Sequence, residues 1–583
     1  MELLERDVQA AVAGALGPDF RDVDPLVRPA QDPRFGDFQS NVAMGLAKRA
    51  GRRPRELADA VVDRLRTDAP AWLSSAGVAG PGFINLTLAP AAVVEAAAEL
   101  VAEGPSPRLG SAGRQRRSPG AVVVDYGGPN LAKEMHVGHL RSSVIGDALS
   151  RVLEATGEQV VRQNHIGDWG TQFGMLLEHL IRSGWEQDHD RSISDLNRLY
   201  QEAKRRFDDE PEFAEAAKKR VVALQAGERE ALRLWQTLIG ESQRHMNEVF
   251  GALGVRLTDD DIRPESFYND RLAAMCEDLE HRGIARVSEG ALCVFVEGEE
   301  APLIIRKSDG GYGYATTDLA AIRFRVDELG ARRLIYVVDA RQQDHFRKVF
   351  AAARAAGYAD TQTRLDYVPF GTVLGPDKRP FKTRSGDTVK LQDLLEEAVQ
   401  RAAEAVAARN ADLDADERAA VAEAVGIGAV KYGDLSNDRI KNYVFDWNRM
   451  LALEGNTAPY LQYSYARIRS IFRKAGTAEH EAMADAGAGR LPAGEAAERG
   501  LLLHLIGYGD TVASVAESLE PHRLAIYLYD LATRYHRFYE ACPVLKDGVA
   551  AELRQQRLAL CAMVATVLRH GLELLGIRVV DRM

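Results

Sequence analysis

The order of patterns between residues 121 and 163 constrains the fold of this chain more than any other feature. An apolar run, AVVV at residues 121–124, precedes a helical pattern that starts at about His139, and EQVVRQNHIG follows it. A strand, a helix and a strand in this order are typical of a parallel sheet with helical crossovers. The same α/β pattern resumes in ALCVFV, PLIIRKSDG, RRLIYVVDA and LDYVPFGTVL. We therefore predict a Rossmann-like domain built on a parallel sheet.

The rest of the chain is arranged around this domain. A length of 583 residues exceeds what one hydrophobic core usually organises, so we expect several domains. Residues 1–105 combine amphipathic helical patterns with one strand pattern, FINLTL, which predicts a small α/β domain. After a linker rich in Gly, Ser, Pro and Arg, we place the parallel-sheet domain at residues 119–395, with a helical insertion at about 185–285. Residues 396–583 predict an all-helical domain, so the fold class is multidomain, α/β and all-α.

Composition excludes several classes of protein. No apolar run approaches the roughly 20 residues of a membrane span. The acidic start MELLERDVQA is unlike a signal peptide, so we expect a cytoplasmic protein with no membrane association. Four widely spaced cysteines form no CxxC pair, which argues against a zinc site and a disulfide framework. The net charge of −11 disfavours nucleic-acid binding, but residues 431–476 hold eight Lys/Arg against four Asp/Glu, so basic surfaces can exist on this acidic protein.

The segment KEMHVGH, residues 133–139, carries the clearest candidate chemistry. His136 and His139 flank Gly138 at a strand-to-helix turn. A zinc site needs three or four donors, and no third ligand or HExxH spacing stands nearby. Two polar rings around a glycine do not fit an apolar core stripe either. A glycine-containing turn that opens a helix presents N–H groups and the positive end of the helix dipole to a phosphate. We therefore predict that the imidazoles donate hydrogen bonds to phosphate oxygens.

The surrounding sequence resembles a known family. PNLAKEMHVGHLRSSVIGDAL is similar to the HIGH signature region of class I aminoacyl-tRNA synthetases, and its wider form resembles the arginyl-tRNA synthetases. Further similar blocks follow in the same order along nearly the whole chain: NHIGDWGTQFGML, SDGGYGYATTDLAA, YVVDARQQDHF, FGTVLGPDKRPFKTRSGDTVKLQDLL, DWNRMLALEGNTAPYLQYSYARIRSI and LLGIRVVDRM. The resemblance implies a Rossmann-like catalytic domain, an N-terminal domain that contacts the tRNA elbow and a C-terminal anticodon-binding bundle. It also implies ATP-dependent ligation of L-arginine to tRNA(Arg) through an arginyl-adenylate.

The resemblance assigns the ATP site to two signatures. The first falls on His136, Gly138 and His139. The second, KMSKS in relatives, falls on FKTRSG, where Lys382, Arg384 and Ser385 keep the polar character. Because this second signature is weakened, the family's lysine just before the first signature is expected to supply charge. Lys133 stands at that place, where a compact ammonium suits a transferring phosphate.

Recognition of arginine requires a carboxylate and an aromatic or hydroxyl partner, because a guanidinium is a planar cation with five donors. Tyr314 and Asp318 stand at i and i+4, on one face of an expected helix, and match the family's guanidinium-binding pair. Asn130 and Gln342 match residues that hold the amino and carboxylate end of the substrate. Glu265, in PESFY, is a candidate second carboxylate for the guanidinium.

Contacts with tRNA are expected at both ends of the chain. The last helices interleave aromatic and basic residues, as expected where bases stack on rings and phosphates meet cations, although about half of these side chains should be structural. The candidates there are Tyr460, Arg467, Arg534 and Arg537. In the N-terminal domain, Phe83 and Asn85 match the place where the family meets the tRNA elbow, whereas FGDFQSN is expected to be structural.

The partners expected from the resemblance are tRNA(Arg), L-arginine and ATP with Mg²⁺. The ion should be carried by the nucleotide phosphates, so we predict no metal-binding residues and no tightly bound metal. We expect a monomer. Family members usually need bound tRNA before they activate the amino acid.

Two other functions are compatible with parts of this sequence. One is an HxGH enzyme that adenylates a small acid without tRNA, such as pantothenate synthetase, which would not require YATTD or the helical domain. The other is a non-enzymatic or specialised paralogue. Intact signature residues argue against lost catalysis, whereas departures at Gly127, Gly128 and Asn448 leave open whether this is the housekeeping copy.

Overall fold

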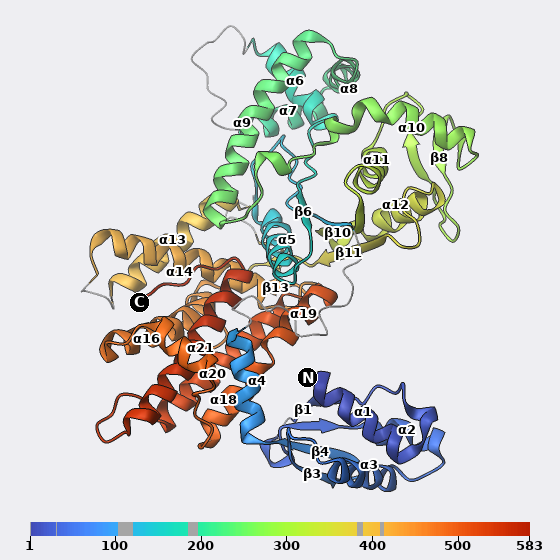
Figure 1. The fold of residues 1–583 in the computed structure, drawn as a ribbon. Helices are drawn as coiled ribbons and strands as arrows, with labels where there is room; N and C mark the ends of the chain where they lie inside the picture. Colours follow the sequence, from blue (N-terminus) through green and yellow to red (C-terminus); the bar gives the residue numbers. More distant parts are fainter. Residues whose placement is uncertain (1, 31, 103–119, 185–195, 382–388, 409–412) are drawn as a thin grey trace.

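A computed structural model describes residues 2–30, 32–102, 120–184, 196–381, 389–408 and 413–583 of the chain (Figure 1). A central α/β part stands between a cluster of helices formed by residues 171–253 and a C-terminal helical bundle. The N-terminal part lies at the side of the bundle, and helix α4 runs along the bundle (Figure 1). None of the described helices is both long enough and apolar enough to cross a membrane.

The N-terminal part is a four-stranded antiparallel sheet in the order β1-β2-β4-β3, packed against helices. Its strands are β1 (Val27–Pro29), β2 (Phe38–Ser40), β3 (Leu73–Ala79) and β4 (Phe83–Leu88), and its helices are α1 (Glu2–Leu16), α2 (Val42–Ala50) and α3 (Pro54–Asp68). Helix α4 (Pro90–Ala102) follows β4 and packs mainly against the bundle. The sequence predicted only the strand at β4. It missed β1 and β2 because three residues are too few to show a period, and β3, LSSAGVA, because it has little apolar alternation.

The central sheet is wholly parallel, in the order β11-β10-β5-β6, as the sequence predicted. Its strands are β5 (Ala121–Asp125), β6 (Val160–Gln163), β10 (Ala331–Asp339) and β11 (Arg364–Phe370), and its covering helices are α5 (Val137–Ala155), α11 (Tyr314–Asp327) and α12 (Gln343–Ala355). Every residue of β5 is buried. Val122 and Val124 join one hydrophobic core and Val123 joins another, so the sheet is covered on both faces.

Two apolar runs that the sequence assigned to the α/β pattern form a separate sheet instead. Strands β7 (Ala285–Ser288), β8 (Ala291–Val294) and β9 (Leu303–Arg306) pair antiparallel. Glu289 and Gly290 connect β7 to β8 with φ values of 51° and 81°, and two positive φ values in a two-residue loop define a hairpin. ALCVFV and PLIIRKSDG, which the sequence assigned to the resumed α/β pattern, therefore lie outside the parallel sheet, because the two-residue loop before β8 and the eight-residue loop after it are too short for parallel crossovers.

Helices form most of the segment between β6 and β7. They are α6 (Thr171–Arg182), α7 (Leu196–Asp209), α8 (Pro211–Gln225), α9 (Arg229–Leu253) and α10 (Asn269–His281). The long helix α9 reaches the central part, where the Ser242 hydroxyl donates to the Leu131 carbonyl at 2.6 Å and the Trp235 indole donates to the Asp168 carbonyl at 2.7 Å. Helix α9 thus supports two loops that follow strands of the central sheet.

The C-terminal part is a helical bundle. Its helices are α13 (Leu391–Ala407), α14 (Ala415–Leu435), α15 (Trp447–Met450), α16 (Ala458–Ala475), α17 (Glu479–Gly487), α18 (Ala496–Ile506), α19 (Tyr508–Ser518), α20 (His522–Ala541) and α21 (Ala551–Leu574). A single two-residue strand, β13 (Tyr443–Val444), pairs with β12 (Val373–Leu374). The expectation that residues 396–583 are all-helical therefore holds for the described residues except at β13.

Buried charges join α5 to the bundle. The Arg141 Nε donates to Asp434 Oδ2 on α14 at 3.0 Å, and both side chains are at most 1% exposed. The Arg141 Nη1 also donates to the Lys441 carbonyl. Near the end of α14, the buried Lys431 ammonium donates to the Leu253 carbonyl, and burial lowers its pKa to about 8. The helix that follows the first signature is therefore fixed by groups from the C-terminal part.

Candidate active site

The candidate site lies where the carboxyl ends of the central strands meet. From β5 the chain passes to β6 on one side, and β10 lies on the other side of β5. Loops that leave β5 and β10 therefore diverge at a topological switch point, where open parallel sheets bind ligands. The loop after β5 carries Asn130 and Lys133, and the turn after β10 carries Gln342.

The two histidines of KEMHVGH cap α5. His136 is the N-cap residue, and its Nδ1 accepts from the Gly138 N–H at 3.0 Å. The Nδ1 of His139 accepts from the His136 N–H at 3.0 Å. Both rings therefore use Nδ1 as an acceptor, so each neutral ring carries its proton on Nε2. The ring centroids lie 4.0 Å apart.

Both imidazoles are held in the neutral form. Burial and the charges of Lys133 and Arg341 lower the pKa of His136. Burial and the neighbouring His136 ring lower the pKa of His139 to about 3. At neutral pH both rings can thus donate an Nε2–H hydrogen bond without adding a charge.

Gly138 is required by the cap itself. A Cβ at this position would lie 2.7 Å from Cε1 of the His136 ring, closer than side chains pack. Gly127 and Gly128, earlier in the same loop, are explained by backbone conformation instead, since their φ values are 86° and 49°. Their N–H groups donate to the Ser142 hydroxyl and the Asn164 side chain, which fixes the loop after β5.

The flank of the second signature reaches the first. The Val137 N–H donates to the Val389 carbonyl, and Lys390 forms an ion pair with Glu134 at 2.8 Å. Phe381, on the other flank, stacks on Phe445 with centroids 5.0 Å apart. The predicted ATP-binding residues between these flanks, Lys382, Arg384 and Ser385, lie outside the described residues.

Lys133 contacts the helical segment that follows β6. Its ammonium lies 4.2 Å from the centroid of the Tyr200 ring on α7, within the range of a cation–π interaction. Lys133 also contributes to the lowered pKa of both signature histidines, so its charge acts on their rings. A cation, two neutral donors and a helix N-terminus are therefore grouped in one place.

A second group of side chains surrounds Asp318. Tyr314 and Asp318 lie on the first turns of α11, as the i, i+4 spacing predicted, and both contact His345 of α12. The His345 Nε2 lies 2.6 Å from Asp318 Oδ2, and the Tyr314 and His345 rings meet edge to face at 4.7 Å. Asp318 is buried, whereas Tyr314 is 64% exposed. The carboxylate thus lies at the base of the group and the phenol at its mouth.

Two further carboxyl groups interact electrostatically with this group of side chains, Glu265 with Asp318 and Asp168 with His165. Burial raises the pKa of Glu265 to about 7, and Asp168 and Asp318 also raise it. Burial raises the pKa of Asp168 to about 6, although its carboxylate accepts from the Ser266 N–H and hydroxyl. Clustered carboxyl groups with raised pKa values favour binding of a cation at this position.

The structure adds His165 and His345, which the sequence-based site omitted. His165 follows β6, and its Nε2 lies 3.8 Å from Asp318 Oδ1. Both histidines stand in segments already compared with the family, NHIGDWG and DARQQDHF. Position after a parallel strand was the available signal, because the carboxyl ends of such strands form one edge. Gln342 is exposed, and Asn130 pairs with Gly167 in an isolated bridge beside His165.

The residues expected to meet tRNA fall on two surfaces. Phe83 and Asn85 lie on one face of β4, where Asn85 accepts from the Gln39 amide at 2.8 Å. On α16 and α20, Arg467 lies 4.5 Å above the Tyr539 ring, and other candidates include the half-buried Tyr460 and the exposed Arg534 and Arg537. Tyr465 and Tyr535 in the same helices are buried, so part of this aromatic pattern is core, as the sequence predicted.

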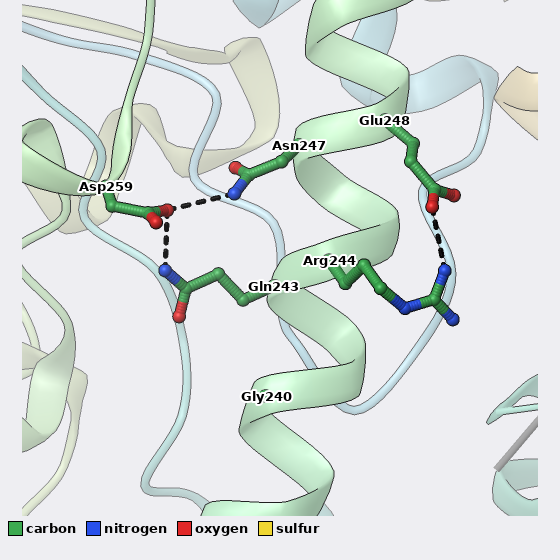
Figure 2. Close-up of a pocket in the computed structure, with 6 residues that line it drawn as sticks. All are labelled: Gly240, Gln243, Arg244, Asn247, Glu248 and Asp259. Atoms are coloured by element: carbon green, nitrogen blue, oxygen red, sulfur yellow. Dashed lines mark hydrogen bonds and ion pairs between the residues drawn. The ribbon is translucent and has the colours of Figure 1, made fainter. Parts of the chain in front are cut away.

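A polar groove on α9 lies apart from this arrangement (Figure 2). Gln243 and Asn247 both donate to Asp259, and Arg244 pairs with Glu248 (Figure 2). These groups satisfy one another and include no residue of either cluster above. Across the described ranges, no three His, Cys, Asp or Glu side chains are grouped as a bound metal ion would need.

The parallel sheet, its switch point and the HxGH cap on α5 are typical of a class I aminoacyl-tRNA synthetase, and the comparison with known families identifies the chain as one. Residues 108–447 match the family described as tRNA synthetases class I (R), catalytic domain. Residues 2–88 match the arginyl tRNA synthetase N terminal domain, and residues 461–583 match the DALR anticodon binding domain. The chain therefore belongs to the arginyl-tRNA synthetase family.

Relatives of known name agree over the full length. The arginine–tRNA ligase of Thermobifida fusca is 50% identical, with 100% of this chain and 99% of that protein covered. The arginine–tRNA ligase of Cellvibrio japonicus is 47% identical with the same coverage. Among solved structures, arginyl-tRNA synthetase from Plasmodium falciparum has a TM-score of 0.85 at 28% identity, covering 100% of this chain and 99% of that one. The Thermus thermophilus arginyl-tRNA synthetase has a TM-score of 0.80 at 27% identity, with both chains fully covered.

Proposed function

We propose that the protein attaches L-arginine to tRNA(Arg) with ATP in two steps. The arginine carboxylate attacks the α-phosphorus of ATP, and the bond to pyrophosphate breaks to leave arginyl-adenylate. A hydroxyl of the terminal adenosine of the tRNA then attacks the activated carbonyl, and AMP leaves. One observation carries this proposal. The neutral rings of His136 and His139, at the N-terminus of α5, and the buried carboxylate of Asp318 lie at the same edge of one sheet.

The first group handles ATP. The Nε2–H groups of His136 and His139 donate to phosphate oxygens as negative charge shifts toward pyrophosphate, and Lys133 supplies a positive charge. Gly138 allows the His136 ring to form the cap. We assign Lys382, Arg384 and Ser385 to the same site by their place in the second signature. Mg²⁺ enters with the nucleotide, held mainly by its phosphates.

The second group binds arginine. Asp318 pairs with the guanidinium, with Tyr314 over it and Glu265 as a second carboxylate. Asn130 and Gln342, which follow the adjacent strands β5 and β10, orient the amino and carboxylate end of the substrate. The carboxylate of the substrate then points toward the ATP group.

We assign tRNA to the two outer parts of the chain. Residues 396–583 form the anticodon-binding domain, with Tyr460, Arg467, Arg534 and Arg537 as contacts. Residues 1–105 form the domain that meets the tRNA elbow, with Phe83 and Asn85 as contacts. Residues 119–395 are then the catalytic domain, with its helical insertion at about 185–285. We further propose that the protein acts as a cytoplasmic monomer.

The decisive experiment is aminoacylation of total tRNA with each of the twenty amino acids in turn. We expect arginine alone to be charged, and on tRNA(Arg) alone. Charging of another amino acid, or adenylation of a small acid that needs no tRNA, would replace this function with one of its rivals. A second measurement is ATP–pyrophosphate exchange, which should stay near background until tRNA(Arg) is added. Strong exchange without tRNA would show that activation is independent of tRNA.

A further inference from the structure

We propose that His165 is a specificity-determining residue, which accepts a hydrogen bond from the arginine guanidinium beside Asp318. This inference rests on the proposed function, because it adds one residue to the proposed arginine pocket. His165 belongs to the loop after β6, between the bridge from Asn130 to Gly167 and the half-buried Glu265. It therefore stands among the residues assigned to arginine, although the sequence analysis assigned it no role.

One hydrogen bond fixes the tautomer of His165. Its Nδ1 lies 3.0 Å from the Arg263 carbonyl oxygen, which can only accept. Nδ1 must therefore carry a proton, and in the neutral ring Nε2 carries a lone pair. The backbone around it is also held, because the Arg263 N–H donates to the Asn164 carbonyl at 3.0 Å. In this neutral form the ring presents Nε2 as an acceptor toward Asp318.

The opposite arrangement holds at the second imidazole. His345 Nε2 lies 2.6 Å from Asp318 Oδ2, and because a carboxylate only accepts, this Nε2 carries the proton. One oxygen of Asp318 is therefore bonded to His345. The other, Oδ1, lies 3.8 Å from His165 Nε2, too far for a hydrogen bond between them. Two acceptors, Oδ1 and Nε2, consequently stand side by side.

A guanidinium satisfies this pair of acceptors. Hydrogen bonds from N–H groups are about 2.9 Å long, so donors of one guanidinium can reach both atoms across a gap of this width. A neutral ring also avoids repelling a substrate that brings its own positive charge. A carbonyl oxygen in place of a guanidinium NH₂, as in citrulline, would instead face a lone pair. The geometry therefore selects a side chain that presents only donors.

The test compares His165→Leu and His165→Gln with the wild-type protein. Leucine cannot accept, so we expect the KM for arginine in aminoacylation to rise about 10- to 100-fold, with kcat nearly unchanged. The glutamine amide can accept, so it should recover part of this loss. The glutamine amide can also rotate and donate to the carbonyl oxygen of citrulline. His165→Gln should therefore lower the ratio of arginine affinity to citrulline affinity, both measured by calorimetry.

His504→Gln is the matched control, because that half-buried ring also faces a backbone carbonyl, Tyr527, at 3.0 Å but lies in the helical bundle. It should leave the KM for arginine unchanged. An unchanged KM in His165→Leu would overturn the proposal. So would equal losses of arginine and citrulline affinity together with a lowered Tm, which would mark a structural role. A wild-type protein that does not charge tRNA with arginine would refute the proposed function instead, which separates the two failures.

Discussion

Removing the Asp434 carboxylate should show how strongly α5, the helix that carries His136 and His139 at its start, depends on the C-terminal bundle. Asp434 and Arg141 are buried, and their 3.0 Å ion pair joins α14 to α5. In Asp434→Ala the Arg141 guanidinium still donates to the Lys441 carbonyl and still lies 5.2 Å from the centroid of the Tyr443 ring. Neither of these partners carries a negative charge. An uncompensated buried charge costs about 3–5 kcal/mol, so the unit that contains α5 and α14 should lose that much free energy of unfolding.

The assay is urea denaturation followed by tryptophan fluorescence, together with the aminoacylation rate. Arg141 follows His139 by two residues on the same helix, so we also expect kcat to fall more than the KM for arginine changes. Asp68→Ala is the matched control, because its pair with Arg64 is 40–48% exposed and should contribute less than about 1 kcal/mol. The double variant Arg141→Met/Asp434→Leu should regain most of the stability, since apolar residues can replace a buried pair. Equal losses of free energy of unfolding in Asp434→Ala and Asp68→Ala would refute this reasoning.

Three other predictions concern the site itself. Asp318→Ala should lower kcat/KM for arginine about a hundredfold or more, because the guanidinium loses its buried partner, and an unchanged value would remove Asp318 from the pocket. Lys133→Ala should lower the adenylation rate more than arginine binding. Tyr200→Ala should lower the adenylation rate less than Lys133→Ala does. Tyr200→Phe should leave that rate almost unchanged, because phenylalanine keeps an aromatic ring below the Lys133 ammonium. Arginine binding should strengthen as pH rises through about 7, where Glu265 loses its proton in the empty pocket, and should weaken up to tenfold per unit below it. A calorimetric pH profile that Glu265→Gln does not flatten would exclude this group.

Local spacing made part of this site predictable. His136 and His139 form a cap within one helical turn, and Tyr314 and Asp318 share one helix face, so adjacent sequence carries both relations. The parallel sheet was also predictable from local sequence, since β5 and β10 contain apolar runs bounded by turns.

Relations between distant segments were not predictable in this way. His345 meets Asp318 across two helices, and Tyr200 meets Lys133 from α7. Neither contact leaves a period or a spacing in the sequence. The short strands of the N-terminal sheet were missed for a related cause, because pairing with neighbouring strands stabilises them more than their own composition does.

The tautomers of the four imidazoles divide the site into two kinds of surface. At α5, His136 and His139 accept backbone N–H groups on Nδ1 and so offer donors, which suit the oxygens of a phosphate. Beside Asp318, the Arg263 carbonyl reverses the arrangement in His165, whose free nitrogen suits a donor. In the proposed function the same residue type therefore serves an anion at one position and a cation at the other. Because backbone groups set three of these four tautomers, changes in loop conformation would alter recognition without replacing any histidine.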